Sequence, residues 1–402
     1  MKILAIGYNS VNNGQASSGR ERLLIDVSKK LIKNNCEVKV FFKRAKGKNE
    51  NFIKSFSLIY RVIDIILNQS CRFFKFPDYK RRYHSENLFD FFIERELKNK
   101  YDLIITTNPW IPKTSTKARL NDVKLILLSG NPSDNLIYNL IKKEKRKIGL
   151  EKYFDSFDSI DRLNKYNIFA KNVNEVITIN KFTAQTFQDD KFFSNSIFFN
   201  VEISQLVNHK PLNTKEEIIN VCNNSLNVFY LAYTSTLKGL HYLIESILKA
   251  NELGFKTKLW IGGNIEHHFF EFLQKKFPNL KNNFVFLGNL DSKRKNWYYK
   301  NCDIFICPSL IDMSPVTVFE AMSNHKPVIL TSNCGNKWIV ENYVNGFVID
   351  PFDSKFIISK LKWCYENKNK LPLMGENAFK SYEKSLEKNT SEIAKIITHI
   401  KQ

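Results

Sequence analysis

The sequence predicts an α/β protein with two Rossmann-like, doubly wound domains that face a central cleft. First, a chain of 402 residues exceeds one ordinary hydrophobic core, so two domains of comparable size are expected. Second, short apolar runs alternate with helical patterns in both halves of the chain, which favours parallel sheets covered by helices. Third, residues 205–227 turn polar and rich in Asn, as is typical of an interdomain linker.

The N-terminal domain is expected to span residues 1–205. Its first 50 residues predict a βαβ unit, because residues 21–34 carry apolar side chains at helical spacing between two apolar runs. Each further apolar run ends in small or polar residues, where a strand would leave a parallel sheet. The expected strands span residues 2–7, 37–42, 102–106, 123–128 and 175–179.

The C-terminal domain is expected to span residues 206–374 and to repeat this alternation. A final segment, residues 375–402, has helical periodicity and could pack back on the N-terminal domain. The expected strands of the second domain span residues 226–232, 258–261, 284–287, 304–307, 328–331 and 347–349.

Charge and cysteine content indicate which partners and which cellular compartment the protein is expected to have. Subtracting 40 acids from 61 bases gives a net charge of +21, which raises nucleic acid, an anionic membrane or a phosphorylated substrate as partners. Seven cysteines without C-x-x-C pairs suggest a reducing compartment. No apolar run reaches the roughly 18 residues of a membrane-spanning helix. A cytoplasmic protein is expected, with a peripheral place on the inner face of the cell membrane as a further hypothesis.

The residues that follow the expected strand 304–307 carry the clearest chemical signal. Ser314 is a good N-cap and Pro315 a good first helical residue, so a helix is expected to start there. The amides of Val316 and Thr317 would then point out of the helix start. Such a start carries about half a positive charge and binds phosphate at the carboxyl edge of a parallel sheet.

Two acids flank this helix start. Glu320, one and a half turns into the helix, could accept both hydroxyls of a ribose, and Asp312, just before the helix, could reach a sugar beyond the phosphates. A capped helix with a solvated Glu is the alternative reading.

These residues resemble the retaining glycosyltransferases of family 4, which have the two-domain GT-B fold. Asp312 and Glu320 match the family's two donor-contacting acids with seven residues between them, and Ser314-Pro315 match a common variant. The first acid is usually Glu, and Asp312 is one methylene shorter. Further similarities are found at Gly335, Glu341, Asn345 and Gly346.

The loop before the second domain's first expected helix contains Lys238-Gly239. A Lys at a helix start opposes the helix dipole, which makes sense if an anion lies between them; a solvated surface Lys is the alternative. The resemblance implies that Lys238 contacts the donor phosphates. Where the family usually has a preceding Arg, this loop offers hydroxyls, including that of Ser235, so these or a base from elsewhere must help.

Three smaller features complete the expected site. Leu287 and Gly288 end an expected strand where family members hold the nucleobase, although turn packing explains them about equally well. Gly19-Arg20 resembles the family's glycine loop, and Arg20 could supply the missing charge. No Asp-x-Asp pair occurs, so no metal ion is expected, and Lys238 would stabilise the leaving diphosphate in its place.

Basic residues interleave with aromatics in residues 72–83, a composition that suits an anionic bilayer surface or stacking on nucleic acid. A second basic run, residues 142–147, is interpreted as a solvated helix face.

Together these features predict a metal-independent, hexosyltransferase-like enzyme without a cofactor, in which a nucleotide sugar is the co-substrate. The resemblance implies retention of anomeric configuration, a donor-side C-terminal domain and an acceptor-side N-terminal domain. The acceptor is expected to be a glycan or lipid-linked, as in bacterial surface polysaccharide synthesis; nucleic acid is not the expected partner. Two alternatives stay open: an epimerase or phosphorylase on the same fold, and a basic nucleic-acid- or membrane-binding protein with a decayed donor site.

Overall fold

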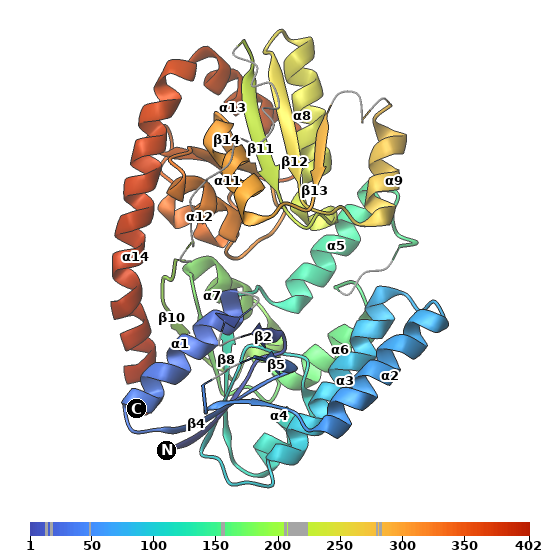
Figure 1. Cartoon of the computed structure of the whole chain (residues 1–402), viewed down its shortest axis with the longest axis vertical. Coiled ribbons are helices and arrows are strands. Elements are labelled where there is room, and N and C mark those ends of the chain that lie inside the picture. Colours follow the sequence, from blue (N-terminus) through green and yellow to red (C-terminus); the bar gives the residue numbers. More distant parts are fainter. Residues whose placement is uncertain are drawn as a thin grey trace. The chain divides into compact units, whose positions relative to one another are not determined.

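The chain forms two compact units (Figure 1). In this computed structural model, unit 1 comprises Met1–Glu202 and Ser391–Gln402, and unit 2 comprises Ile203–Thr390. Most of the expected linker, residues 205–227, lies outside the residues that the structure describes. The described residues are 1–12, 15–16, 19–47, 50–153, 157–204, 207, 224–278, 280 and 284–402.

Unit 1 contains a parallel sheet with the strand order β10-β9-β8-β7-β1-β4-β6. These strands are β1 (Lys2–Ile6), β4 (Glu37–Phe42), β6 (Ile53–Ser55), β7 (Leu103–Thr106), β8 (Lys124–Ser129), β9 (Glu175–Thr178) and β10 (Ile197–Asn200). A small second sheet contains β2 (Ser10–Asn12), β3 (Gln15–Ala16) and β5 (Arg44–Lys46).

Helices cover both faces of this sheet, so alternate residues of β1 are buried on opposite sides. Leu4 and Ile6 belong to a core cluster that includes Phe89 of α3 and Tyr166 of α6. The helices are α1 (Gly19–Lys33), α2 (Leu58–Phe73), α3 (Asp78–Glu96), α4 (Pro112–Leu120), α5 (Asp134–Ile148), α6 (Ile160–Ala170) and α7 (Lys181–Gln188), with a 3₁₀ turn η1 (Lys191–Phe193).

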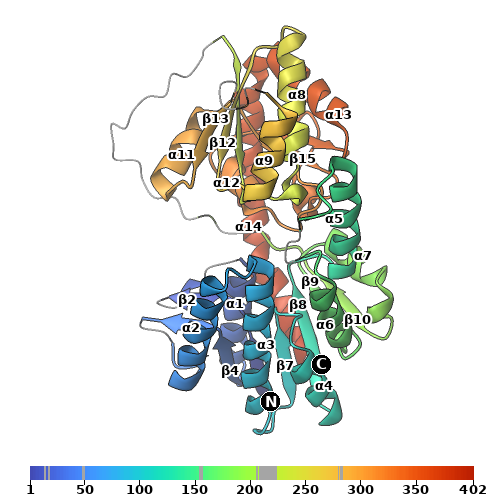
Figure 2. The same ribbon diagram turned by 90° about the vertical axis from the view of Figure 1, so that its right-hand side faces the viewer.

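Unit 2 contains a parallel sheet with the order β13-β12-β11-β14-β15-β16. Its strands are β11 (Leu226–Leu231), β12 (Thr257–Gly262), β13 (Val285–Gly288), β14 (Ile304–Cys307), β15 (Val328–Thr331) and β16 (Gly346–Ile349). Its helices are α8 (Leu240–Glu252), α9 (His267–Lys276), α11 (Ser292–Asn301), α12 (Val316–Ser323), α13 (Ser354–Glu366) and α14 (Leu371–Lys401), and its 3₁₀ turns are η2 (Thr236–Lys238), η3 (Gly335–Ile339) and η4 (Lys368–Lys370). Helices α8 and α13 lie alongside each other (Figure 2).

The predicted fold class is confirmed, and each predicted strand is present with ends that differ by at most one residue. The prediction missed β6 and β10, both at sheet edges, and the small second sheet. β10 has the sequence Ile197-Phe198-Phe199-Asn200, a short apolar run between polar residues that does not by itself distinguish a strand from a helical segment.

Helix α14 begins at Leu371, four residues before the expected start, and contributes to both units. Its last turns belong to unit 1, where the ring of His399 stacks on Phe199 at 4.0 Å between centroids and forms an ion pair with Glu175. Its earlier part belongs to unit 2, where the hydroxyl of Tyr382 accepts a hydrogen bond from the amide of Val207 at 2.9 Å.

We predict that Gly375→Ala in α14 destabilises the protein. In an open helix this change stabilises by about 0.5–1 kcal/mol. Here a Cβ atom would lie 2.1 Å from the carbonyl oxygen of His325, so the helix must shift, at a cost of about 1–3 kcal/mol. Thermal unfolding should show a midpoint several degrees lower, whereas Lys380→Ala, at an exposed position of α14, should leave it nearly unchanged. An unchanged or higher midpoint for Gly375→Ala would contradict the predicted clash.

Candidate active site

The sheet of unit 2 reverses its strand order between β11 and β14, because β12 follows β11 on one side and β14 lies on the other. In open α/β sheets the loops at the carboxyl ends of such neighbouring strands form the binding crevice. The loop after β11 carries Lys238, and the loop after β14 carries Asp312. The amide of Leu310 donates to the carbonyl oxygen of Leu237 at 2.8 Å and so joins the two loops.

Gly239 sets how closely these loops approach. Its φ of +68° is a left-handed conformation, which glycine adopts without strain. A Cβ atom at this position would lie 2.0 Å from the carbonyl oxygen of Pro308. The Lys-Gly pair therefore lies directly against the end of β14, and a side chain at position 239 would push the loop carrying Lys238 away.

Lys238 and Asp312 form an ion pair, with Nζ 2.6 Å from Oδ2. The two side chains are 29% and 19% exposed, so the pair is partly screened from water. Burial by itself lowers the pKa of Lys238, but the charge of Asp312 and the hydrogen bond it accepts outweigh burial and raise that pKa above its ordinary value. Lys238 therefore presents a permanent positive charge at the switch point.

Helix α12 begins at Val316, so the prediction that Ser314 caps the helix and that Pro315 is its first residue is wrong by one position. Pro315 precedes the helix with a ψ of 108° and no side chain caps it. The amide of Ser314 instead donates to Oδ1 of Asp312, two residues earlier, at 3.3 Å, which is a local turn of the Asx type. The first amides of α12, including that of Thr317, have no acceptor within the helix.

The hydroxyl of Ser314 is buried, and among the described residues it has no hydrogen-bond partner. A buried hydroxyl without a partner costs free energy. It therefore has capacity to bond a group that lies before the helix start.

Glu320 is held on two sides by α11. The phenol of Tyr299 donates to Oε2 at 2.9 Å, and Lys295 forms a close ion pair with Oε1. The side chain of Glu320 is only 12% exposed. Burial, with the neighbouring charge of Glu320, raises the pKa of Tyr299 well above its ordinary value, so this phenol remains a donor.

Lys295 and Tyr299 were not among the residues predicted from the sequence. Their spacing of four residues places them on one face of a helix, which is a weak signal that could have been noticed. The same helix also carries Lys293 and Arg294, and the sequence does not show which of these bases meets Glu320.

The remaining predicted residues of unit 2 lie at the same sheet edge. Ser235 directly precedes η2, and its carbonyl oxygen accepts from the amide of Lys238 at 3.0 Å. Leu287 packs against the core at the end of edge strand β13. The next residue, Gly288, has a φ of +60° and accepts from the amide of Gly263 at 2.7 Å.

Gly19 and Arg20 belong to unit 1, where they start α1. The Arg20 side chain runs over Gly130 in the loop after β8, because a Cβ atom at Gly130 would lie 3.1 Å from Cγ of Arg20. Burial lowers the pKa of Arg20, and the charge of Glu21 opposes this shift. Arg20 thus lies against the loop of residues 129–131.

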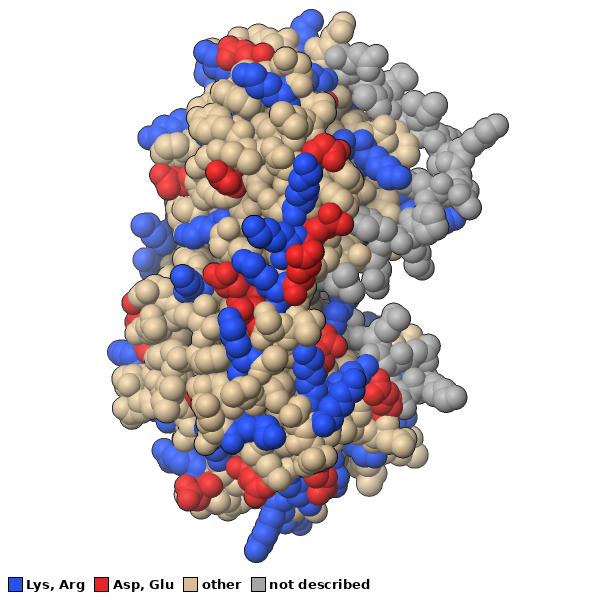
Figure 3. Space-filling model, turned by 90° about the vertical axis from the view of Figure 1, so that its left-hand side faces the viewer, with Lys and Arg blue, Asp and Glu red and all other residues tan. Residues whose placement is uncertain are grey.

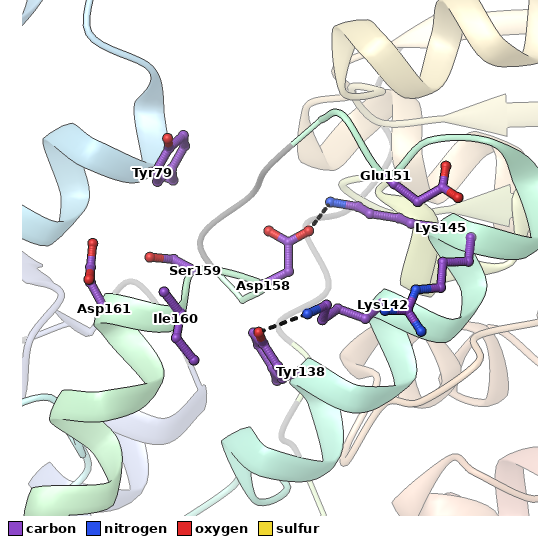
Figure 4. Close-up of a pocket in the computed structure, with 10 residues that line it drawn as sticks. Tyr79, Tyr138, Lys142, Lys145, Glu151, Asp158, Ser159, Ile160 and Asp161 are labelled. Atoms are coloured by element: carbon purple, nitrogen blue, oxygen red, sulfur yellow. Dashed lines mark hydrogen bonds and ion pairs between the residues drawn. The ribbon is translucent and has the colours of Figure 1, made fainter.

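Unit 1 also contains a pocket of about 440 Å³ between α5 and the residues before α6 (Figure 4). Lys145 crosses beside it and donates to Oδ2 of Asp158 at 2.7 Å, and Lys142 donates to the hydroxyl of Tyr138 at 3.1 Å. The interpretation of residues 142–147 as a solvated face holds for the exposed Lys142, Lys143, Arg146 and Lys147 but is wrong for the buried Lys145. Its partner Asp158 is distant in sequence from this run, so composition could not reveal the pair.

Within the described part of the chain, no group of three or more His, Cys, Asp or Glu side chains is arranged to hold a metal ion. Among the same residues, no helix combines the length and apolarity required to cross a bilayer.

Known proteins resemble this chain in both sequence and fold. CapM, a capsular polysaccharide biosynthesis glycosyltransferase of Staphylococcus aureus, is 26% identical over 191 residues, which make up 47% of this chain and 48% of that protein. Sucrose-phosphate synthase from Thermosynechococcus elongatus has a TM-score of 0.69 at 13% identity, covering 100% of this chain and 98% of that one. Anabaena HepE in complex with UDP-glucose has a TM-score of 0.58 at 16% identity, covering 99% and 100%.

The chain spans about half or less of the length of the curated relatives it matches. The solved structures, at 13% and 16% identity, bear on the fold. A family model described as glycosyl transferases group 1 matches residues 214–381, which include the loops of Lys238 and Asp312. The chain therefore has the GT-B fold, and over residues 214–381 it is similar to the glycosyl transferases group 1.

Proposed function

We propose that the protein is a retaining, family 4 glycosyltransferase that moves a hexosyl group from a nucleotide sugar to a hydroxyl acceptor. The observation that carries this proposal is the Lys238–Asp312 pair at the switch point of unit 2, beside the start of α12. HepE, which shares the fold, is named as a complex with UDP-glucose, and this supports a uridine nucleotide as the first donor to test.

The donor diphosphate is proposed to lie between Lys238 and the start of α12. An ammonium has three donors, so Lys238 can keep its bond to Asp312 and donate to a phosphate oxygen as well. The first amides of α12, those of Val316 and Thr317, and the hydroxyl of Ser314 supply further donors on the other side. These groups are fixed by the fold before the donor binds, so little reorganisation is needed when charge develops on the leaving group.

Glu320 is proposed to hold the ribose of the nucleotide. Each carboxylate oxygen has two lone-pair sites, so the bonds to Tyr299 and Lys295 leave acceptor capacity for the ribose hydroxyls. Lys295 balances the charge of Glu320 in the partly buried site. Leu287 and Gly288 at the end of β13 are proposed to face the nucleobase.

In the proposed reaction the bond between the sugar's anomeric carbon and the diphosphate oxygen breaks. The acceptor hydroxyl oxygen forms the new bond on the same face, and its proton passes to the leaving phosphate. Asp312 is proposed to orient the sugar. Lys238 and the helix start neutralise the leaving group, a role that a metal ion plays in other enzymes, and no cofactor is required.

The acceptor is proposed to be a glycan or lipid-linked group that enters from unit 1, where Gly19 and Arg20 lie. The name of CapM supports a role in bacterial surface polysaccharide synthesis, and such an enzyme would work at the inner face of the cell membrane. Nucleic acid is not proposed as a partner. On the face that Figure 3 shows, Lys and Arg are interspersed with Asp and Glu and do not form one continuous basic stripe.

Lys238→Ala should lower turnover by about a hundredfold or more, because a fixed charge at the leaving group is typically worth about 3–4 kcal/mol of transition-state stabilisation. The measurement is release of nucleoside diphosphate from a nucleotide sugar in the presence of acceptor, with thermal unfolding as the check on folding. Lys249→Ala, an exposed lysine of α8 in the same unit, is the matched control. Normal turnover of Lys238→Ala would remove Lys238 from the mechanism.

A donor screen should identify a nucleotide sugar that raises the unfolding midpoint of the native protein, because a ligand that binds only the folded state stabilises it. Glu320→Gln keeps the size of the side chain but removes its charge, so the shift should shrink at equal ligand concentration. UDP-glucose is the first compound to test. If no nucleotide sugar stabilises the native chain, the proposed function fails; if one is isomerised without any acceptor, an epimerase replaces it.

Asp312→Asn should reverse the pKa shift of Lys238. With Asp312 present the pKa is raised, so the amine stays protonated and unreactive to higher pH. Without that charge burial, the largest influence, lowers the pKa against only the smaller opposing effects of Cys307 and Cys334. Acylation of Lys238, followed by mass spectrometry and normalised to exposed Lys355, should therefore begin at lower pH in the variant. An unchanged or upward-shifted profile would show that Asp312 does not set the charge of Lys238.

A further inference from the structure

Helix α2 of unit 1 exposes several large apolar side chains and buries a charged one. Leu58 and Ile66 are 74% and 56% exposed, whereas Asp64 is 1% exposed. Apolar side chains normally face the core and charged ones face water. The exposed apolar side chains of α2 are Leu58, Ile59, Val62, Ile63, Ile65, Ile66 and Phe73.

Ion pairs and packing hold the helix in this orientation. Asp64 accepts from Arg44 at 2.7 Å and lies 3.1 Å from Nζ of Lys43, and the hydroxyl of Ser85 in α3 donates to it at 3.2 Å. On the same face, the ring of Tyr60 packs against Phe56 at 4.4 Å between centroids. Turning the apolar face inward would expose Tyr60 and leave Lys43 without its partner. The outward apolar face is therefore a fixed feature of the unit.

The end of this helix adds aromatic and basic side chains. Phe73, Phe74 and Phe76 are exposed, and Arg72, Lys75 and Lys80 are exposed beside them. Between residues 57 and 84 the chain has six Lys and Arg but two Asp, of which Asp64 is buried. Helix α2 lies alongside α3, which carries part of this charge (Figures 1 and 2).

We propose that this face, the α2 surface, lies on an anionic lipid bilayer. The α2 surface comprises Leu58, Ile59, Val62, Ile63, Ile65, Ile66, Phe73, Phe74 and Phe76 with the flanking Arg72, Lys75 and Lys80. Apolar side chains, interfacial aromatics and cations in one surface match the acyl, boundary and headgroup layers of such a bilayer. A partner protein or a second copy would cover the apolar face but would give no role to the surplus of cations.

The length of α2 excludes a spanning arrangement. The helix has 16 residues, and a membrane-spanning helix needs about 20. It therefore lies in the plane of the interface. This inference specifies the surface behind the peripheral membrane location in the proposed function, and it does not depend on the donor chemistry of unit 2.

The surface also adjoins a polar pocket. Tyr79, next to Lys80 in sequence, lines the unit 1 pocket together with Lys142 (Figure 4). Arg146 also lines this pocket. A protein seated on a bilayer by the α2 surface would bring this pocket close to the headgroups. An acceptor anchored by a lipid would then reach unit 1 without leaving the membrane.

Vesicle sedimentation of the full chain, without any nucleotide sugar, tests the proposal. The native protein should bind vesicles of phosphatidylcholine with phosphatidylglycerol and bind phosphatidylcholine alone much more weakly. Leu58→Ser with Ile66→Ser should weaken binding to the anionic vesicles at least tenfold, because two exposed apolar side chains no longer enter the bilayer. The control is Leu120→Ser with Ile168→Ser, at two exposed apolar positions on α4 and α6, which should bind as the native chain does.

Two double variants, each lacking two positive charges, distinguish an effect of the cations near α2 from an effect of the overall charge of the chain. Arg72→Gln with Lys80→Gln should weaken binding to anionic vesicles by about fivefold for each charge removed. Lys355→Gln with Lys362→Gln, at exposed positions of α13, should not. Equal losses in both pairs would mean that net charge alone drives binding, and that result overturns the proposal.

Two other results would overturn it. One is undiminished vesicle binding by Leu58→Ser with Ile66→Ser. The other is a native chain that is dimeric without lipid and becomes monomeric in this variant, which would assign the surface to a second copy. Stabilisation by a nucleotide sugar is measured on the same variants and should be unchanged. Vesicle binding without any donor stabilisation would therefore count against the proposed enzyme and not against the α2 surface.

Discussion

The ion pair of Lys238 and Asp312 joins two loops that lie 74 residues apart in the chain, and the geometry of the candidate site depends on it. The pair forms only because Gly239 lets its loop lie directly against the carbonyl oxygen of Pro308. Asp312 in turn accepts from the amide of Ser314 and so turns the chain into α12. One carboxylate therefore positions both the cation and the helix start, and a change at Asp312 would disturb all the proposed phosphate contacts together.

Much of the fold could be predicted because buried parallel strands form continuous apolar runs. The strands 304–307 and 328–331 have the bounds that the sequence indicates. Edge strand β10 escaped prediction because its apolar run, residues 197–199, is short and bounded by polar residues, and such a run is ambiguous between strand and helix. The start of α12 was misplaced by one residue because the side chain of Asp312 accepts from the amide of Ser314 in a local Asx-type turn, and such a turn competes with capping of the helix by Ser314.

Asp312 and Glu320 were evident from the sequence, but of the two lysines that pair with them only Lys238 was predicted. Lys238 lies in a recognisable Lys-Gly pair, whereas Lys295 belongs to a helix with several neighbouring bases. Its role follows from the packing of α11 against α12, which brings its ammonium and the phenol of Tyr299 to the same carboxylate. A contact between two helices depends on the fold as a whole and is not encoded in the local pattern of either one.

Stability alone would not place Asp64 inside and Leu58 outside. Burying a charged group removes its hydration, and its ion pairs recover that loss only in part, while leaving large apolar side chains in water forgoes their burial. The outward residues of α2 also increase the risk of aggregation. A chain that keeps Asp64 buried and the apolar side chains of α2 exposed loses stability unless the apolar face is covered during function. The cations that flank that face favour a covering that is both apolar and negatively charged, and a bilayer with anionic headgroups has both properties.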